Sequence, residues 1–185
     1  RLHCGNTVMG WLRQRRVESA THVDRGQFLA LVRQIGGEFA AFALKIGILG
    51  ASGYTGADAV RLLARHPNAE ITALTANTHA GKAMGEVFPH FFMLDLPKLV
   101  EWEKVDWSKL DAVFCGLPHG TTQEIIAAVL KANPGIKILD MSADFRLRDK
   151  DTYAQWYGHE HRALELQREA VYGLTEFYRE KIASA

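Results

Sequence analysis

Three evenly spaced glycines could bind a phosphate group. Gly50, Gly53 and Gly56 follow the apolar run Lys45–Leu49 and precede residues with helical apolar spacing. A strand that turns through glycines into a helix presents backbone N–H groups and a helix N-terminus to an anion. The first glycine allows the tight turn, the second lets a pyrophosphate approach, and the third lets helix and strand pack closely. The spacing is G-x-x-G-x-x-G instead of G-x-G-x-x-G; we expect a dinucleotide site, with a plain tight turn as the alternative.

The residues after the next predicted strand indicate which dinucleotide would bind. An NAD site usually places Asp or Glu at the end of this strand, where the carboxylate holds the ribose 2′-hydroxyl. No acidic residue lies between Ile71 and Lys82, and hydroxyl groups, Asn77, His79 and Lys82 occur instead. These groups could accept a 2′-phosphate, so the sequence favours NADP over NAD. The alternative for any single residue is a polar surface loop.

Two further loops carry polar residues at the ends of predicted strands. His119, within Leu117–Gly120, could be an acid–base group, and the alternative is a positional role beside a cofactor. Arg146, within Ser142–Leu147, could hold a phosphate or carboxylate through two parallel hydrogen bonds. The alternative for this second loop is a structural ion pair between Asp144 and Arg146.

Cys115 invites interpretation as a nucleophile, because acyl-transfer dehydrogenases use a thiolate. It ends the apolar strand predicted over Asp111–Cys115, and no base is adjacent to it in sequence. A buried cysteine behaves as a small hydrophobic residue. We therefore predict a structural role for Cys115.

Alternating strands and helices must position these loops. Strands are predicted at 45–50, 70–75, near 99–100, at 111–115 and at 136–140, and helices at 55–66, 121–131, 150–157, 164–169 and 175–182. This alternation predicts an α/β fold with a doubly wound, Rossmann-like parallel sheet and helices on both faces. In such a sheet, ligands bind beyond the carboxyl ends of the strands, where all four loops lie.

Composition argues against two classes of partner. The 185-residue chain has a net charge of +1, and its charge distribution does not predict the clustered basic face that nucleic-acid binding needs. No run of about 18 uninterrupted apolar residues occurs, so no transmembrane helix is predicted. Two distant cysteines, Cys4 and Cys115, give neither a metal-binding spacing nor a disulfide framework, and we expect no metal site.

Residues 1–44 differ in composition from the remainder. They begin at Arg1, contain six arginines and three acidic residues, and include the basic cluster Arg13–Arg16. An arginine-rich, acid-poor segment is typical of a targeting presequence, although the three acids weaken the match. The alternative is upstream translated sequence without a role in the fold. We expect this segment to be disordered or weakly helical, the latter from about Gln27, and to lie outside the domain.

Four motifs, in unbroken order, resemble one family. They are Gly50–Gly56, Leu117–Gly120, Ser142–Leu147 and Val171–Glu176. Together they are similar to N-acetyl-γ-glutamyl-phosphate reductase, an enzyme of arginine biosynthesis whose fold is similar to that of aspartate-semialdehyde dehydrogenase. The resemblance extends from about Lys45 to Ala185 and does not include residues 1–44.

The resemblance implies a reaction and a set of contacts. The family uses NADPH to reduce an acyl phosphate, through a cysteine thioester, to N-acetylglutamate 5-semialdehyde with release of phosphate. By resemblance, the cofactor contacts are Gly50, Ala51, Ser52, Gly53, Tyr54, Thr55 and Gly56 at the pyrophosphate, Thr75 and Asn77 near the adenosine ribose, Pro118 and His119 near the nicotinamide, and Leu117 and Ser142 elsewhere in the site. Arg146 would bind the substrate phosphate.

The resemblance also implies that the family's nucleophile lies elsewhere. That cysteine belongs to a Gly-Cys motif shortly after a segment like Val171–Glu176, and the sequence reaches Ala185 before such a motif. We therefore expect the cofactor-binding part of a reductase, inactive alone, with a sheet incomplete at its C-terminal side. The full-length enzyme would be a cytoplasmic homo-oligomer acting on a small molecule, or a plastid enzyme if residues 1–44 are a transit remnant.

Two other functions stay open from the sequence. A stand-alone nucleotide-binding or regulatory module would bind NADP tightly and melt cooperatively. An NAD-dependent oxidoreductase of another family, or another semialdehyde dehydrogenase, is the third reading. An NAD-dependent enzyme would bind NAD more tightly than NADP, contrary to the missing acid after the second strand.

Overall fold

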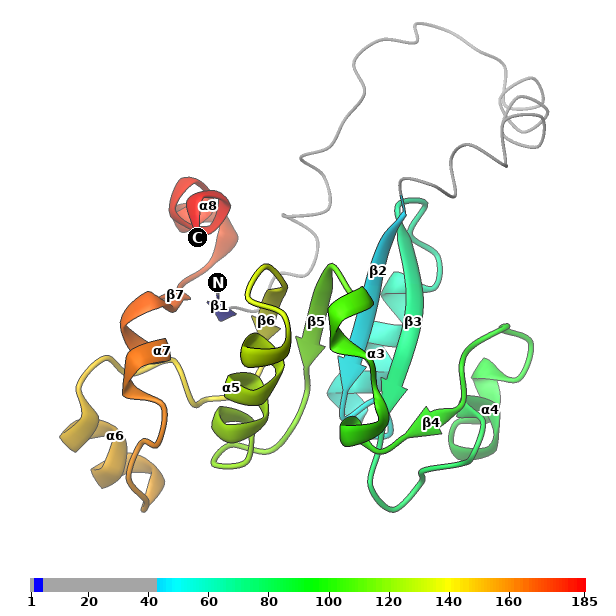
Figure 1. Ribbon diagram of the computed structural model, residues 1–185, viewed down its shortest axis with the longest axis horizontal. Helices are drawn as coiled ribbons and strands as arrows, with labels where there is room; N and C mark the ends of the chain where they lie inside the picture. The colour runs from blue at the N-terminus through cyan, green and yellow to red at the C-terminus, as the bar shows by residue number, and fades with distance from the viewer. Residues whose placement is uncertain (1, 5–42) are drawn as a thin grey trace, which may run out of the picture.

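One parallel sheet organises the protein. The computed structural model describes residues 2–4 and 43–185. Within them, seven strands lie in the order β4-β3-β2-β5-β6-β1-β7, and every neighbouring pair is parallel (Figure 1). The strands are β1 (Leu2–Cys4), β2 (Leu44–Leu49), β3 (Ala69–Thr75), β4 (Leu99–Val100), β5 (Ala112–Cys115), β6 (Lys137–Asp140) and β7 (Val171–Tyr172).

Helices make the crossovers that parallel strands require. The α-helices are α3 (Tyr54–Leu63), α4 (Met84–Val87), α5 (Thr122–Ala132), α6 (Lys150–Tyr157), α7 (Leu164–Glu169) and α8 (Thr175–Ser184). Short 3-10 turns are η2 (Pro89–Phe91), η3 (Trp102–Lys104) and η4 (Trp107–Lys109).

The sheet is wound in two directions from a switch point between β2 and β5. β2 connects through α3 to β3 on one side, whereas β5 connects through α5 to β6 on the other. Because such crossovers are right-handed, the two helices lie on opposite faces. Figure 1 shows α3, in cyan, behind the sheet and α5, in yellow-green, in front of it. The predicted doubly wound α/β fold with helices on both faces is confirmed.

Each face of the sheet buries its own hydrophobic core, because side chains alternate between faces along a strand. Ile46 and Ile48 of β2 join Leu63 of α3 in one core. Leu49 of β2 joins Ile126 of α5 in the other. Burying each side chain of this size contributes roughly 1.5–3 kcal/mol. The two cores therefore fix which way the side chains of β2 face, and its parallel pairing with β5 brings the two carboxyl ends to the same edge.

The predicted elements agree with the observed ones to within a few residues. α6 and α7 have the predicted bounds, and β4 is the short strand expected near residues 99–100. The helix predicted over 55–66 instead ends at Leu63, because Pro67 disfavours helical backbone at the residue before it. Between β3 and β5 the chain also forms α4 and the three 3-10 turns, for which no helix was predicted.

The N-terminal segment differs from expectation at its two ends. Residues 1–44 were predicted to lie outside the domain, but Leu2–Cys4 pairs with both β6 and β7, and Leu44 begins β2. The basic cluster Arg13–Arg16 and nearly all of the helix expected from Gln27 fall outside the described residues.

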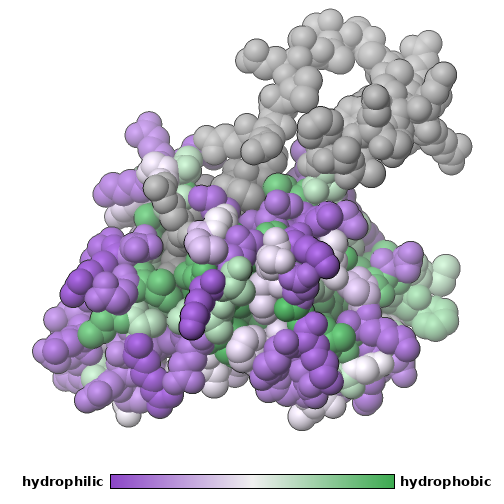
Figure 2. All heavy atoms as spheres, viewed as in Figure 1, coloured by the Kyte–Doolittle hydropathy of each residue, from purple (hydrophilic) through white to green (hydrophobic). Residues whose placement is uncertain are grey.

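The visible surface is mostly polar, with local apolar groups (Figure 2). One such group lies at the right of the view, near α4, and the adjoining Phe92 and Met93 are 78% and 87% exposed. These two side chains therefore belong to neither core. Among the described helices, none has the length and apolar character needed to cross a membrane.

Glycines bring the switch-point backbones into close contact. Gly50 has φ +73°, a left-handed value that favours glycine, and a Cβ on it would lie 2.9 Å from the Gly116 carbonyl oxygen. A Cβ on Gly56 would lie 2.2 Å from the Gly50 oxygen and 2.7 Å from the Ala51 Cα. The start of α3, the turn after β2 and the loop after β5 can pack this closely only without side chains at these positions.

We expect Gly56→Ala to lower the free energy of unfolding by at least about 2 kcal/mol, because the methyl group meets backbone atoms that cannot rotate away. Gly53→Ala is the matched control, since its Cβ would lie 3.4 Å from the Gly50 oxygen and Gly53 has an extended φ of −88°. The control should change stability by less than about 0.5 kcal/mol. Urea unfolding measures both, and equal losses would contradict this account.

Candidate functional site

Four loops meet at the carboxyl edge of the sheet, where ligands bind in doubly wound folds. They follow β2, β3, β5 and β6. Backbone bonds join neighbouring loops: Ala51 N–H donates to the Thr75 oxygen at 2.9 Å, and Met141 N–H donates to the Cys115 oxygen at 3.0 Å. Gly116 N–H donates to the Leu49 oxygen at 2.9 Å. The structure therefore brings the predicted loops together at one edge.

The N-terminus of α3 is open to an anion. The first turn of any helix has N–H groups without acceptors inside the helix, and here they belong to Tyr54, Thr55 and Gly56. The N-cap residue, Gly53, supplies no side-chain hydrogen bond, and no acidic side chain lies in the first turn. Gly53, Tyr54 and Thr55 are exposed, while Ser52 is half-buried and Ala51 is fully buried. These donors and the positive end of the helix dipole suit a phosphate.

Thr75 lies under the glycine turn. It is 3% exposed, and its hydroxyl oxygen accepts the Gly50 N–H at 3.2 Å. This bond fixes the turn from below, a role that the sequence analysis did not anticipate. Asn77 and Lys82 are exposed in the loop that follows, and His79 is half-buried with Nδ1 unpaired. The predicted contacts of Thr75 and Asn77 with an adenosine ribose stay predictions.

The loop after β5 exposes Pro118 and His119, while Leu117 packs against the α5-side core. The Pro118 oxygen accepts the Thr121 hydroxyl at 2.7 Å. The His119 ring stacks on the His159 ring with centroids 6.3 Å apart and lies 5.6 Å from the Tyr157 ring. No carboxylate bonds to His119 within the described residues. Both roles considered for His119 stay predictions.

The loop after β6 holds Asp144 away from Arg146. Both Asp144 carboxylate oxygens accept the Gly120 N–H at 2.9 Å, and one also accepts the Tyr153 hydroxyl at 2.6 Å. Arg146 is exposed, and its Nε donates to the Ser142 carbonyl oxygen at 3.1 Å. The Asp144–Arg146 ion pair considered from the sequence is therefore wrong: within the described chain, neither side chain bonds to the other.

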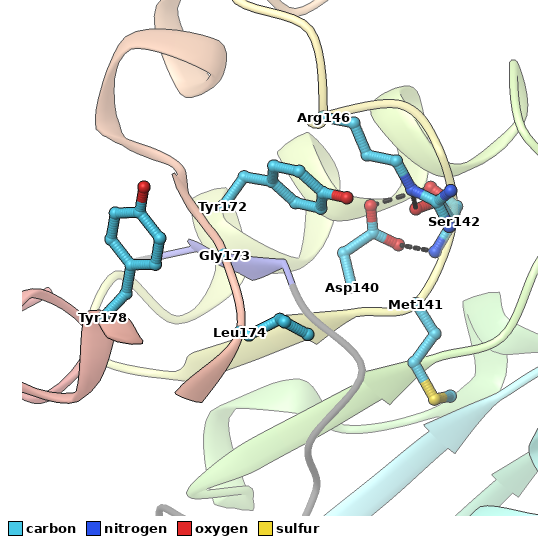
Figure 3. A pocket seen from close by; sticks show the side chains of 8 residues that line it. All are labelled: Asp140, Met141, Ser142, Arg146, Tyr172, Gly173, Leu174 and Tyr178. Carbon is cyan, nitrogen blue, oxygen red and sulfur yellow. Dashed lines mark hydrogen bonds between the residues drawn. The ribbon is translucent and has the colours of Figure 1, made fainter. Parts of the chain in front are cut away.

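A cavity of about 290 Å³ opens beside this loop. It is lined by Asp140, Met141, Ser142, Arg146, Tyr172, Gly173, Leu174 and Tyr178 (Figure 3). The Tyr172 hydroxyl points toward the Arg146 and Ser142 side, whereas Tyr178 stands on the opposite side of the cavity. The Ser142 hydroxyl donates to Asp140 Oδ2 at 2.7 Å, so this side chain is already engaged. Arg146 is the cation available to an anion in this cavity.

Sequence reasoning missed the residues behind the loops. Gln123, Tyr153 and His161 are buried and polar, and they come from three separate segments. Tyr172 and Tyr178 line the cavity, and of the two only Tyr172 lies within a family motif, Val171–Glu176. A polar residue at a core position of a predicted helix is the signal that could have identified Gln123.

The histidine at 161 is held in its neutral form. Its Nε2 contacts the Asp144 carbonyl oxygen at 2.9 Å, and its Nδ1 accepts the Ala163 N–H at 3.1 Å. A carbonyl only accepts and an amide only donates, so the proton lies on Nε2. Burial lowers the pKa of His161, and a proton on Nδ1 would break the bond from Ala163.

Cys115 is fully buried within the α5-side core, as predicted. Burial, followed by the nearby Asp140 carboxylate, raises the pKa of the Cys115 thiol far above its ordinary value. The reactive form of a cysteine is the thiolate. Cys115 therefore has the properties of a packing residue.

A family model and several named proteins match this chain over most of its length. The family described as "Semialdehyde dehydrogenase, NAD binding domain" matches residues 45–185. N-acetyl-gamma-glutamyl-phosphate reductase of Afipia carboxidovorans is 61% identical over 143 residues, which cover 76% of this chain and 41% of that protein. The same enzyme of Rhodospirillum rubrum is 60% identical over 77% of this chain and 41% of its own length.

A plant protein matches at a similar level. The probable chloroplastic N-acetyl-gamma-glutamyl-phosphate reductase of Oryza sativa is 58% identical over 142 residues, covering 77% of this chain and 34% of that protein. The chain thus spans about two fifths or less of the length of these curated relatives.

We expect stability to fall as the pH drops from 7.5 to 5.5, and His161 to contribute to the fall. The unfolded chain binds a proton near pH 6.5, whereas the folded chain resists protonation of His161, so stability present above that pH is lost below it. One such group contributes at most about 1.4 kcal/mol per pH unit.

Urea unfolding at several pH values checks this expectation. His161→Gln should be less stable at pH 7.5 and show a shallower pH dependence than the original chain. His90→Gln, at an exposed position, is the control and should keep the original slope. An unchanged slope in His161→Gln would contradict the assignment.

Proposed function

Because the chain belongs to the semialdehyde dehydrogenase family through its NAD-binding domain, we propose that it is the NADP-binding portion of an N-acetyl-γ-glutamyl-phosphate reductase. The observation that carries the proposal is the open N-terminus of α3 above the glycine turn, at the switch point of the sheet. The relatives described above, which carry that enzyme name, support the choice of substrate.

The residues of the site fit a dinucleotide. Gly50 and Gly56 let the turn, the start of α3 and the loop after β5 pack together, and Gly53 is exposed beside them. The N–H groups of Tyr54 and Thr55 would hold the pyrophosphate. NADPH would supply the hydride that reduces an acyl group to an aldehyde. The exposed Pro118 and His119 would bound the nicotinamide on one side.

NADP is preferred over NAD on the charge of the loop after β3. This loop begins beside the glycine turn, because Thr75 bonds to Gly50 and Ala51. It contains no carboxylate up to Lys82, whose ammonium group is exposed. Lys82 and the exposed amide of Asn77 are the groups that we assign to the 2′-phosphate.

The substrate would bind at the cavity beside the β6 loop. The Arg146 guanidinium has no carboxylate partner among the described residues and faces the cavity with Tyr172 (Figure 3). A guanidinium binds phosphate through two parallel hydrogen bonds. Ser142, which bonds to Arg146 through its carbonyl oxygen, would contact the cofactor.

The acyl transfer step needs a thiolate that Cys115 does not provide, because its thiol is buried with a raised pKa. We propose that the chain contributes cofactor and substrate binding, and that alone it does not catalyse the reduction. A cytoplasmic compartment, or a plastid one as for the Oryza relative, belongs to the same proposal. The exposed Phe92 and Met93 support association of the whole enzyme into a homo-oligomer.

The proposal is tested by titrating NADPH and NADH into the chain. We expect NADPH to bind at least about tenfold more tightly, since a charged hydrogen bond contributes about 1.5–3 kcal/mol. Lys82→Ala should remove most of this preference and leave NADH affinity unchanged. Lys131→Ala, which removes an equal exposed charge at the far end of α5, should change neither affinity. Tighter binding of NADH would reject the NADP assignment in favour of an NAD enzyme.

A further inference from the structure

We infer that a buried hydrogen-bond network of three side chains, Gln123, Tyr153 and Asp144, sets the position of the loop Pro118–Gly120. Through this loop, the network positions the nicotinamide end of the cofactor. The inference rests on the proposed function, which places the nicotinamide beside this loop. In this view, Gln123, Tyr153 and Asp144 are positioning residues that act through the loop backbone. None of them is expected to touch the reacting atoms.

The hydrogen bonds of this network all run in one direction, from donor to acceptor toward Asp144. Arg162 N–H donates to Gln123 Oε1 at 2.5 Å, and Gln123 Nε2 donates to the Tyr153 hydroxyl oxygen at 2.9 Å. The Tyr153 hydroxyl in turn donates to Asp144 Oδ1 at 2.6 Å. Each donor therefore has its acceptor, and the Asp144 carboxylate is the final acceptor. Gly120 N–H donates to the same carboxylate from the other side.

The carboxylate holds the loop in one backbone conformation. Gly120 has φ +86°, and a Cβ at this position would lie 3.0 Å from His159 Nε2. The loop is therefore fixed at Gly120 by Asp144 and bounded by the His159 ring. On the outer side, His119 stacks against His159 and is exposed. A change in the direction of the Gly120 N–H would move Pro118 and His119 directly.

The three side chains of the network are buried, so the hydrogen bonds to the Asp144 carboxylate are strictly required. Gln123, Asp144 and Tyr153 are all 0% exposed. Among the described residues, none of the ion pairs includes Asp144. A buried carboxylate is costly unless hydrogen bonds satisfy it. Its charge is balanced here by neutral donors, one of which is the loop N–H. A phenol is protonated at neutral pH, and burial and the Asp144 carboxylate raise the pKa of Tyr153 further, so that its hydroxyl is a donor.

Several elements converge on this one acceptor. Gln123 comes from the first turn of α5, Tyr153 from the middle of α6, and Asp144 from the loop after β6. His161 donates to the Asp144 backbone oxygen at 2.9 Å and ties the segment before α7 to the same residue. The position of the loop Pro118–Gly120 is thus determined by α5 and α6, which are not part of the glycine turn and α3.

The test compares two ligands that differ only in the nicotinamide. Tyr153→Phe removes the donor to Asp144 and keeps the ring. We expect it to weaken NADPH binding about fivefold to tenfold, equivalent to one net hydrogen bond, and to leave the affinity for 2′-phospho-ADP-ribose within about twofold. Asp144→Asn should show the same selective loss. Tyr157→Phe, one turn later on α6, keeps its ring contacts and should change neither affinity.

The outcomes separate the possible failures. A merely structural role predicts a lower melting temperature with equal effects on both ligands, and this result in a folded variant overturns the inference. If Tyr153→Phe does not fold, Asp144→Asn decides in the same way, and Gln123→Met, which removes the donor to Tyr153, gives a third measurement. If the original chain binds neither ligand, the proposed function fails and the inference fails with it. Binding of both ligands by the original chain without selective loss in the variants rejects the inference alone.

Discussion

The contact of glycine backbones at the switch point is the constraint on which the rest of the structure depends. Gly50, Gly56 and Gly116 come from three segments in close contact, and a side chain on Gly50 or Gly56 would collide with the backbone of a neighbouring segment. Their close approach places the N-terminus of α3 directly beyond β2 and against the loop after β5. Each later part of the site, including the β6 loop that bonds back to Cys115, is positioned relative to this contact.

Hydrophobic and polar interactions divide the work of positioning. The two cores orient the strands and helices, and they depend on shape and burial more than on direction. The Asp144 carboxylate, by contrast, specifies one orientation of one N–H group in an exposed loop. A loop that must expose Pro118 and His119 cannot be fixed by burying them, so its backbone is held from behind by hydrogen bonds.

Sequence patterning predicted the fold because the strands are short apolar runs, as expected for a parallel sheet buried on both faces, and the helices between them show helical apolar spacing. Ile46, Gly47, Ile48 and Leu49 form one such run, and the glycine turn follows at once. The loops could be placed at the carboxyl edge by topology alone. The partners of Asp144 could not be predicted, because Gly120 and Tyr153 meet it only through tertiary packing, and proximity in sequence suggested Arg146 instead. The hydrogen bond from Gly50 to the Thr75 hydroxyl could not be predicted either, because it depends on the register of β3 with β2.

The separation of the two cores by the sheet has a consequence for local unfolding. The α3 side and the α5 side share strands but bury different side chains. If one helix detaches from the sheet, only the core on that face becomes exposed to water and the other core stays buried. Such local unfolding therefore costs less free energy than global unfolding. The two sides are coupled at the glycine contact, because α3 and the loop after β5 meet there through backbone atoms. Amide exchange in this protein should therefore divide into two cooperative units that share the strand ends at the switch point.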